Sequence, residues 1–169
     1  PAGRNAIPAT LVSGCIVVAA DLSREQVFEW LANVPDPEIP VLSILDLGIV
    51  RDVELGDTIT VSLAPTYSGC PATEVIESSV LRALEQHGLE DVAIKRVLSP
   101  PWTTDWISEA GREKMRRYGI APPTTNRPVA CPQCESTKTE RVSEFGSTAC
   151  KAAYRCQDCL EPFEYFKCL

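Results

Sequence analysis

Four cysteines near the C-terminal end of this 169-residue chain have the spacing of a tetrahedral metal site. They form two Cys-x-x-Cys pairs, Cys131 with Cys134 and Cys156 with Cys159, and 21 residues separate the pairs. Each pair can present two thiolates to one ion, and four thiolates complete the closed shell that Zn²⁺ accepts in structural sites. The pattern therefore predicts a structural zinc site in a zinc ribbon. Two disulfides or an Fe(Cys)₄ centre are the alternatives.

Three further cysteines surround or precede this motif. Cys150 and Cys168 either pack in the core of the cysteine-rich segment or act as a second pair of soft metal ligands. Cys15 lies among isoleucine and valine residues, where a free cysteine usually behaves as a small hydrophobic side chain.

Cys70 occupies a position that favours reactivity. It precedes Pro71, a residue suited to the first position of a helix, so Cys70 is expected at the N-cap of that helix. There the unpaired N–H groups and the helix dipole favour the thiolate, the form that acts as nucleophile and metal ligand. A capping cysteine without chemistry is the alternative. Hydroxyl groups able to hydrogen-bond the sulfur or a bound ion surround it on Thr66, Tyr67, Ser68 and Thr73.

A catalytic Cys–His pair is excluded by helix geometry. His87, the single histidine, lies 17 residues beyond Cys70 along the same expected helix, which corresponds to about 25 Å. A dyad needs a separation of about 3 Å. Because the sequence also shows no glycine-rich phosphate loop and no Ser-His-Asp set, enzymatic turnover is not expected.

Three acidic residues, Asp36, Glu38 and Asp46, lie in and just after a proline-rich loop. One interpretation is that they are solvated surface carboxylates. The other is that Asp36 and Glu38 supply hard oxygen ligands or hydrogen bonds beside Cys70. The spacing alone leaves both interpretations open.

The elements that must hold these residues follow a small α+β pattern, a helix plus ββαβ. Ser23 and Gln26 form a capping box that begins the first helix, and Gly56-Asp57 is a hairpin signal between the first two strands. The expected elements are a helix from residue 23, strands over 44–55 and 58–64, a helix over 72–86, a strand over 91–98 and a helix over 105–118. The expected segments are an N-terminal arm over 1–22, the α+β domain over 23–120, a Pro-rich linker over 121–128 and a zinc ribbon over 129–169.

Charge and hydropathy argue against nucleic-acid and membrane partners. Residues 1–126 carry 10 Lys/Arg and 17 Asp/Glu, and residues 127–169 carry six of each. Neither part has the basic surplus that drives binding to a phosphate backbone. The longest apolar run is far shorter than the roughly 20 residues of a membrane span. Since no signal-peptide pattern is found, a reducing cytoplasm is expected, where clustered thiols indicate metal or redox chemistry.

Two sequence runs resemble a known family. DPEIPVLSILDLGIVRDVEL (residues 36–55), followed by APTYSGCP (residues 64–71), resembles the metal-sulfur cluster biosynthesis family, which includes SufT-like proteins and small factors of cytosolic iron–sulfur assembly. The likeness covers about residues 24–100. It implies that the family's reactive cysteine falls on Cys70 and its acidic loop on Asp36 and Glu38.

A second pair of runs extends the resemblance over nearly the whole chain. SPPWTTDWISEAGREKMRRYGIAPP (residues 99–123) and FGSTACKAAYRC (residues 145–156) are similar to the D subunits of 1,2-phenylacetyl-CoA epoxidases. That resemblance implies a bacterial protein that accompanies a di-iron oxygenase and a reductase with flavin and a [2Fe–2S] cluster in phenylacetate breakdown. The single-domain assembly factors lack the ribbon, which could serve as a docking module.

The resemblance implies an accessory maturation factor that transiently binds iron or an iron–sulfur unit through Cys70 and delivers it to a companion epoxidase subunit. Because a cluster usually needs four ligands, it would be shared across a homodimer, with the client, or with Cys150 and Cys168. A non-catalytic scaffold that docks the oxygenase through the ribbon is the alternative, and a nucleic-acid-binding ribbon is a third hypothesis that the charge balance disfavours. The candidate ligands of the transient site are Cys70, Asp36, Glu38 and Thr66, with Cys150 and Cys168 as further candidates.

Overall fold

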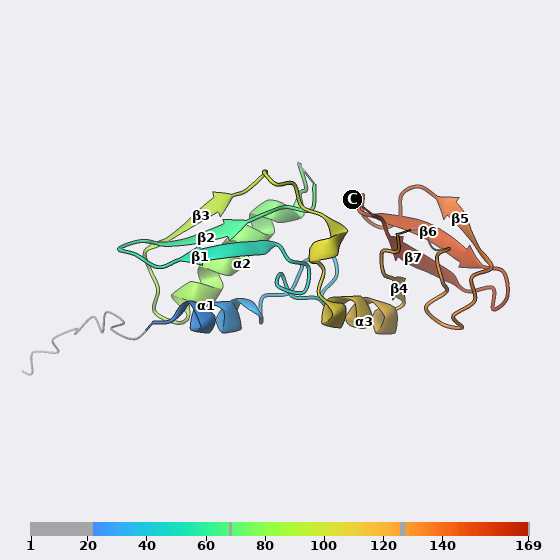
Figure 1. The fold of residues 1–169 in the computed structure, drawn as a ribbon, viewed down its shortest axis with the longest axis horizontal. Coiled ribbons are helices and arrows are strands. Elements are labelled where there is room, and N and C mark those ends of the chain that lie inside the picture. Colours follow the sequence, from blue (N-terminus) through green and yellow to red (C-terminus); the bar gives the residue numbers. More distant parts are fainter. Residues whose placement is uncertain (1–21, 68, 126–127, 169) are drawn as a thin grey trace, which may run out of the picture.

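The computed structural model describes residues 22–67, 69–125 and 128–168, and these form two units joined through one helix (Figure 1). Cys15 and the rest of residues 1–21 lie outside the described residues. Within the described ranges, no helix combines the length and the apolar character needed to cross a membrane. The first unit contains α1 (Arg24–Leu31), β1 (Val50–Glu54), β2 (Ile59–Leu63), α2 (Ala72–Glu85) and β3 (Val92–Arg96).

The first unit is a three-stranded sheet with two helices packed against it (Figure 1). β1 and β2 form an antiparallel hairpin, and β3 runs parallel to β2 after the crossover through α2. The predicted capping box is confirmed, because the Ser23 hydroxyl accepts from the Gln26 N–H at 3.2 Å while the Gln26 side chain accepts from the Ser23 N–H at 2.9 Å. The predicted helix-plus-ββαβ arrangement is therefore confirmed.

Helix α2 positions the loop that carries Cys70. Its buried face consists of Ile76, Val80 and Leu84, at the i+4 spacing that predicted an amphipathic helix. These side chains share a core with the buried residues of β2. Because the loop between β2 and α2 is anchored at both ends in this core, Cys70 has a defined place in the fold.

The first strand is shorter than predicted and begins at Val50. The residues before it form turns, in which the Leu47 N–H donates to the Ser43 carbonyl at 3.2 Å. Gly48 adopts a φ of 66°, a backbone conformation that favours glycine and that no strand contains. The apolar residues before Val50 are buried, as the residues of a predicted core strand would be. They are buried in a compact turn, however, and not in a strand.

The helix predicted over 105–118 is divided into two elements. Ser108 begins the second one by accepting a hydrogen bond from the Gly111 N–H at 2.9 Å, and Gly119 ends it with a φ of 90°. Asp46 ties this helix to the preceding unit, since its carboxylate lies 2.6 Å from the Lys114 ammonium. Asp46 is thus a structural residue of the turn. The two elements are a short 3₁₀ turn, η1 (Thr104–Trp106), and α3 (Glu109–Tyr118).

The second unit is a four-stranded sheet with the strand order β4-β7-β6-β5. β4 follows α3 directly and pairs parallel to β7, whereas β7, β6 and β5 are antiparallel neighbours. The sheet therefore includes Ile120, which precedes the predicted Pro-rich linker, and Ala121, the first residue of that linker. Its strands are β4 (Ile120–Ala121), β5 (Thr139–Ser143), β6 (Lys151–Cys156) and β7 (Pro162–Phe166).

The second unit has a small apolar cluster of its own but also contributes to the core of the first unit. Phe166, at the end of β7, and Cys150, just before β6, are 1% and 4% exposed and pack with the core of the first unit. The Phe166 ring lies 6.2 Å from that of Trp102, and the Trp102 indole N–H donates to the Leu47 carbonyl at 2.8 Å. The second unit is therefore packed against the first, close to the proline-rich loop.

Candidate metal sites

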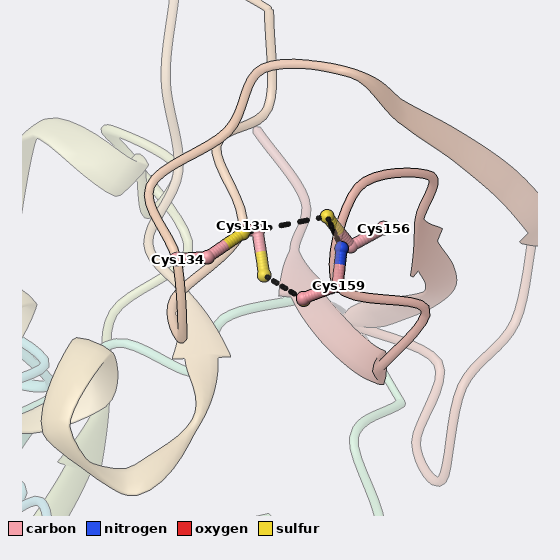
Figure 2. A group of neighbouring side chains, drawn as sticks. All are labelled: Cys131, Cys134, Cys156 and Cys159. Atoms are coloured by element: carbon pink, nitrogen blue, oxygen red, sulfur yellow. Dashed lines mark hydrogen bonds between the residues drawn. The ribbon is translucent and has the colours of Figure 1, made fainter.

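The four cysteines of the two Cys-x-x-Cys pairs converge from two loops of the second unit (Figure 2). Their sulfur atoms all lie within 4.8 Å of one another. The Sγ atoms of Cys131 and Cys159 are 3.6 Å apart, as are those of Cys134 and Cys156. Two thiolates at 2.3 Å from a tetrahedral ion would be about 3.8 Å apart. The geometry therefore fits a tetrahedral four-sulfur site.

The two ligand loops have the same local backbone. The N–H of the first cysteine in each loop donates to the carbonyl five residues further on, at 2.9 Å for Cys131 and 3.0 Å for Cys156. The residue after the second cysteine is left-handed in both loops, with φ of 61° at Glu135 and 65° at Leu160. Each loop is thus a copy of one turn that points two thiols toward a common centre.

The electrostatics of this cluster favour a bound cation. The Cys159 N–H, 3.5 Å from the Cys156 sulfur, helps to lower the pKa of Cys156 to about 7. At Cys159 a backbone hydrogen bond with Glu161 lowers the pKa, but burial and the neighbouring sulfurs outweigh it and raise the pKa to about 12. Because four adjacent thiolates repel one another, a bound cation is needed for all four to ionise.

Cys70 lies in the loop between β2 and α2, where its side chain is partly buried. The prediction that Cys70 is the N-cap of α2 was wrong by one residue. Pro71 is the N-cap and already has helical φ and ψ of −65° and −23°, because the proline ring fixes φ near the helical value. The Cys70 carbonyl accepts from the Thr73 N–H at 3.1 Å. The backbone of Cys70, and not its thiol, therefore supports the first turn.

Cys70 lines two hollows. The inner one is a cavity of about 20 Å³, and the outer one is a more open cleft of about 420 Å³. The structure therefore brings together the four residues predicted for the transient site. Among the residues that line the inner cavity are Asp36, Glu38, Thr66, Cys70, Thr73 and Phe166. Ser68 lies outside the described residues.

Asp36 and Glu38 have different roles in the proline-rich loop. The buried Asp36 carboxylate accepts from the N–H groups of Glu38 and Ile39 at 2.9 and 2.8 Å, and so holds the loop in its turn. Burial raises the pKa of Asp36, although these two N–H groups oppose the shift. Burial and the neighbouring Asp36 raise the pKa of Glu38. Asp36 thus supports the loop, and Glu38 directs its carboxylate toward the second unit.

Cys150 of the second unit meets Glu38 of the first. Its thiol donates toward Glu38 Oε2 at 3.8 Å and lies 3.0 Å from the Thr148 hydroxyl. Burial raises the pKa of Cys150, and the Glu38 carboxylate contributes to the shift. Cys150 therefore does not pack only against apolar side chains.

Lys151 is a functional candidate that sequence reasoning missed. It is 3% exposed, and its Nζ lies 2.9 Å from Glu164 Oε2. Its charge acts to lower the pKa of Asp36, Glu38 and Cys150. No sequence signal identifies it, because a lysine in a strand is ordinarily solvated.

The Tyr67 hydroxyl responds to ionisable groups of both units. Burial raises the pKa of Tyr67 to about 12, and the Cys70 thiol, Glu38 and Cys150 all contribute to that shift. The Tyr67 hydroxyl is therefore within electrostatic range of both thiols and of the carboxylate. The sequence indicated this tyrosine only as one of several hydroxyl groups near Cys70.

The remaining candidate residues lie elsewhere. Cys168 is exposed, and its thiol lies 3.4 Å from the Thr124 carbonyl and 3.5 Å from the Tyr165 hydroxyl, beside a separate cleft of about 390 Å³. His87, beyond the far end of α2 from Cys70, stacks on Trp30 with ring centroids 4.1 Å apart. Cys168 and Cys150 thus contact different groups.

Two protein-family models match the chain, one for each unit. The model of the iron-sulfur cluster assembly proteins matches residues 24–96. The model of the PaaD zinc beta ribbon domain matches residues 118–167. Together with the structure, these matches confirm the predicted fold class, an α+β domain followed by a zinc ribbon.

Individual relatives extend this result. A protein from Escherichia coli strain K12, named as the D subunit of 1,2-phenylacetyl-CoA epoxidase, is 48% identical over 89% of this chain and 98% of its own length. The Fe-S protein maturation auxiliary factor SufT from Staphylococcus aureus strain USA300 is 37% identical over 44% of this chain and 88% of its own length. The crystal structure of a domain of unknown function, DUF59, from Bacillus anthracis covers 54% of this chain and 90% of that chain, with 26% identity and a TM-score of 0.51.

Proposed function

Since this chain belongs to the family of 1,2-phenylacetyl-CoA epoxidase D subunits, we propose that it is an accessory maturation factor of that system and not a catalytic subunit. In this proposal it binds iron or an iron–sulfur unit transiently through Cys70 and delivers it to a companion subunit. The phenylacetyl-CoA epoxidase system would supply that companion, either the oxygenase or the reductase, in the cytoplasm.

One observation carries this proposal. Cys70 is not the capping residue of α2, and it lines both an inner cavity with carboxylates and a more open outer cleft. A soft thiolate beside hard carboxylates suits Fe²⁺, which accepts sulfur and oxygen ligands. An open side lets a client's own ligands approach the bound ion, as a transient carrier requires. The match of this unit to iron-sulfur cluster assembly proteins supports the same cargo.

We assign a different metal role to the four-cysteine cluster. Its four thiols fit a tetrahedral ion and leave no position for a substrate, which is typical of structural Zn²⁺. Zn²⁺ would hold the ligand loops together and stabilise the fold of the ribbon. Cys131, Cys134, Cys156 and Cys159 are the proposed ligands.

The test is a substitution at Cys70 in cells that depend on the epoxidase. Cys70→Ser is expected to lower the iron content of the client subunit and the epoxidase activity several-fold, while the zinc content of this chain stays at one per molecule. Cys168→Ser is the matched control, because it removes a thiol that lies outside the Cys70 cavity. Full client iron and full epoxidase activity in Cys70→Ser cells would refute the carrier role.

A scaffold function is the second candidate. Three large apolar side chains of the ribbon are highly exposed, Val142, Phe145 and Leu160 at 65%, 64% and 60%. Such side chains are suited to binding another protein. If the chain is a scaffold, it co-purifies with the epoxidase in fixed stoichiometry, and Cys70→Ser does not change this. Loss of co-purification in a Phe145→Ser variant with normal client iron would favour the scaffold.

A further inference from the structure

We propose that one face of the ribbon sheet docks a segment of a companion epoxidase subunit, and that this segment brings a carboxylate and an apolar side chain to a cleft beside Arg141 and Lys167. This inference rests on the association with a companion that the proposed function requires. It names the surface that makes the contact and the chemistry of the partner's segment. Docking is thereby assigned to a different part of the chain from Cys70.

This cleft, the ribbon cleft, has a volume of about 390 Å³ and lies on the opposite side of the ribbon sheet from Phe166. Lys151 and Phe166 are paired across β6 and β7, and Phe166 packs in the core of the first unit. Ala152 and Tyr165 are the next pair, and they point to the other side because side chains alternate along a strand. The contact with the first unit therefore leaves this face uncovered. The residues that line the cleft include Arg141, Glu144, Ala152, Tyr154, Tyr165 and Lys167.

The first support is a surplus of positive charge in the ribbon cleft. Arg141 and Lys167 both line it, and among the described residues that line it Glu144 is the only carboxylate. Glu144 pairs with Arg141 and also lies 3.9 Å from the Lys167 ammonium, so it serves both cations. The cleft is thus locally basic in a chain whose net charge is −7. A carboxylate from a bound segment would give the second cation a partner of its own.

The second support is the environment of the Lys167 ammonium. The Lys167 side chain is only 18% exposed, although an ammonium group has three hydrogen-bond donors. It donates to the Glu144 carbonyl at 3.2 Å, and it lies 4.7 Å from the centre of the Phe145 ring. The Glu144 carboxylate oxygen at 3.9 Å is too distant for a hydrogen bond. Because a partly enclosed cation is costly without acceptors, this ammonium favours an additional anionic partner.

The third support is the apolar surface in and beside the ribbon cleft. Tyr154 and Tyr165 line it and pack edge to face, with ring centroids 5.5 Å apart. The exposed side chains of Val142 and Phe145 directly follow lining residues in the chain. Tyrosine, phenylalanine and arginine are enriched in protein interfaces, and exposed apolar side chains mark such surfaces. The docked segment is therefore expected to carry an apolar side chain near its carboxylate.

The shape of the ribbon cleft fits a protein segment better than a free small anion. A small-molecule site encloses most of its ligand. The ribbon cleft is open, and exposed apolar side chains lie beside it, which a small anion would leave uncovered. A second copy of this chain is the other possible occupant, and it is distinguished from a companion subunit by concentration-dependent self-association.

The experiment measures binding of the full, zinc-loaded chain to the purified oxygenase and, separately, to the purified reductase of the same epoxidase system by isothermal titration calorimetry. We expect one of the two to bind, and Arg141→Glu to raise its dissociation constant about tenfold or more. Arg155→Glu is the matched control. It makes the same change of charge on β6, next to Tyr154 but on the other side of the sheet, and should retain wild-type affinity.

A second variant and a change of salt test the two parts of the contact separately. Phe145→Ser removes an exposed apolar side chain and should weaken binding without a change in the salt dependence. Added NaCl should weaken binding of the wild type more than binding of Arg141→Glu, because salt screens an ion pair that the variant lacks. Each variant is first checked for one zinc per chain and for cooperative unfolding. Cys168→Ser keeps the charge of the cleft and should bind normally.

The outcomes separate this inference from the proposed function. Wild-type affinity in Arg141→Glu, an equal loss in Arg155→Glu, or no binding of either companion by the wild type would overturn the ribbon cleft as the docking site. Self-association that Arg141→Glu abolishes, without binding of a companion, would assign the cleft to a second copy instead. The carrier function is judged by client iron in Cys70→Ser, which should dock normally. If Arg141→Glu fails to dock while Cys70→Ser leaves client iron unchanged, the docking site stands and the carrier function fails.

Discussion

The four-cysteine cluster and the Cys70 cavity are both groups of metal-binding side chains, but they are built in opposite ways. The cluster takes its ligands from two copies of one turn within the ribbon, and its four sulfurs are already within 4.8 Å of one another. The cavity takes its polar groups from the proline-rich loop, from the loop before α2 and from the start of α2.

This difference supports the distinct metal roles that we propose for the two sites. A closed shell of four like ligands holds an ion permanently, because it leaves no position through which the ion can be exchanged. A mixed set beside an open cleft binds more weakly and admits a competing ligand. The same chain can therefore combine a structural metal with a transient one, provided that the two sites are kept chemically distinct.

The largest expected effect comes from breaking the closed cluster. Cys156→Ser removes one of the four thiolates, and structural Zn²⁺ in zinc-finger peptides contributes about 10–16 kcal/mol of folding energy. We expect loss of zinc and unfolding of the ribbon, observed as collapse of its NMR signal dispersion. Cys70→Ser should keep its zinc and its ribbon signals. A folded, zinc-free ribbon in Cys156→Ser would show that zinc is not what stabilises this unit.

The second effect tests whether the stabilities of the two units are coupled through the apolar core that Phe166 enters. Phe166→Ala should cost about 3–5 kcal/mol of unfolding free energy, as truncation of a buried phenylalanine does. Because Phe166 packs in the core of the first unit, both units should lose stability in chemical denaturation followed by NMR. Phe163→Ala is the matched control, since Phe163 belongs to the ribbon's own cluster. Equal effects of the two substitutions on the first unit would contradict the shared core.

A third, smaller effect concerns Lys151, the buried lysine whose charge acts on the carboxylates of the Cys70 cavity. Lys151→Met removes the partner of Glu164 and the nearby positive charge, and should lower stability by about 1–3 kcal/mol in urea denaturation. Lys167→Met, at a lysine that donates to the Glu144 carbonyl at 3.2 Å, serves as the control and should cost less. A Lys151→Met protein as stable as the wild type would show that this charge has no role in the junction.

The same comparison explains what the sequence could predict. The zinc ribbon follows from two Cys-x-x-Cys pairs, because a local turn presents both thiols whatever the rest of the fold. The capping box at Ser23 and the buried face of α2 are likewise local patterns, and the structure confirms both. The turn around Gly48 was missed because buried apolar residues show no clear period in a compact turn.

The Cys70 cavity was only partly predictable for a related reason. Cys70, Asp36 and Glu38 were identified as candidates by residue type and by family resemblance, and the structure places them around one cavity. That Cys150 meets Glu38, and that Lys151 is buried beside them, depends on how the ribbon packs on the first unit. Contacts between units separated by more than 100 residues leave no local signal in a single sequence.

The smallest effect, a pH dependence, sharpens the comparison because it reports on a carboxylate of the Cys70 cavity. Burial and Asp36 raise the folded-state pKa of Glu38 above its ordinary value of 4.5. The protonated form is thus favoured in the folded state, so this stabilisation is present below pH 4.5 and is lost as the pH rises through the folded-state pKa. Glutamine does not titrate. In iron-free protein, the unfolding free energy of Glu38→Gln relative to the wild type should therefore increase from pH 4 toward neutral pH.

Glu113→Gln provides a control of opposite sign. Hydrogen bonds and charge from Arg117 and Arg116 lower the pKa of the exposed Glu113 carboxyl. Its stabilising contribution is therefore present above pH 4.5 and is lost as the pH falls through the lowered pKa. Relative to the wild type, Glu113→Gln should lose stability toward neutral pH while Glu38→Gln gains it, in urea titrations at each pH. If the stability difference between Glu38→Gln and the wild type does not change with pH, Glu38 titrates as a solvated carboxylate, and if it changes in the same direction as for Glu113→Gln, the folded state lowers the pKa of Glu38 instead of raising it.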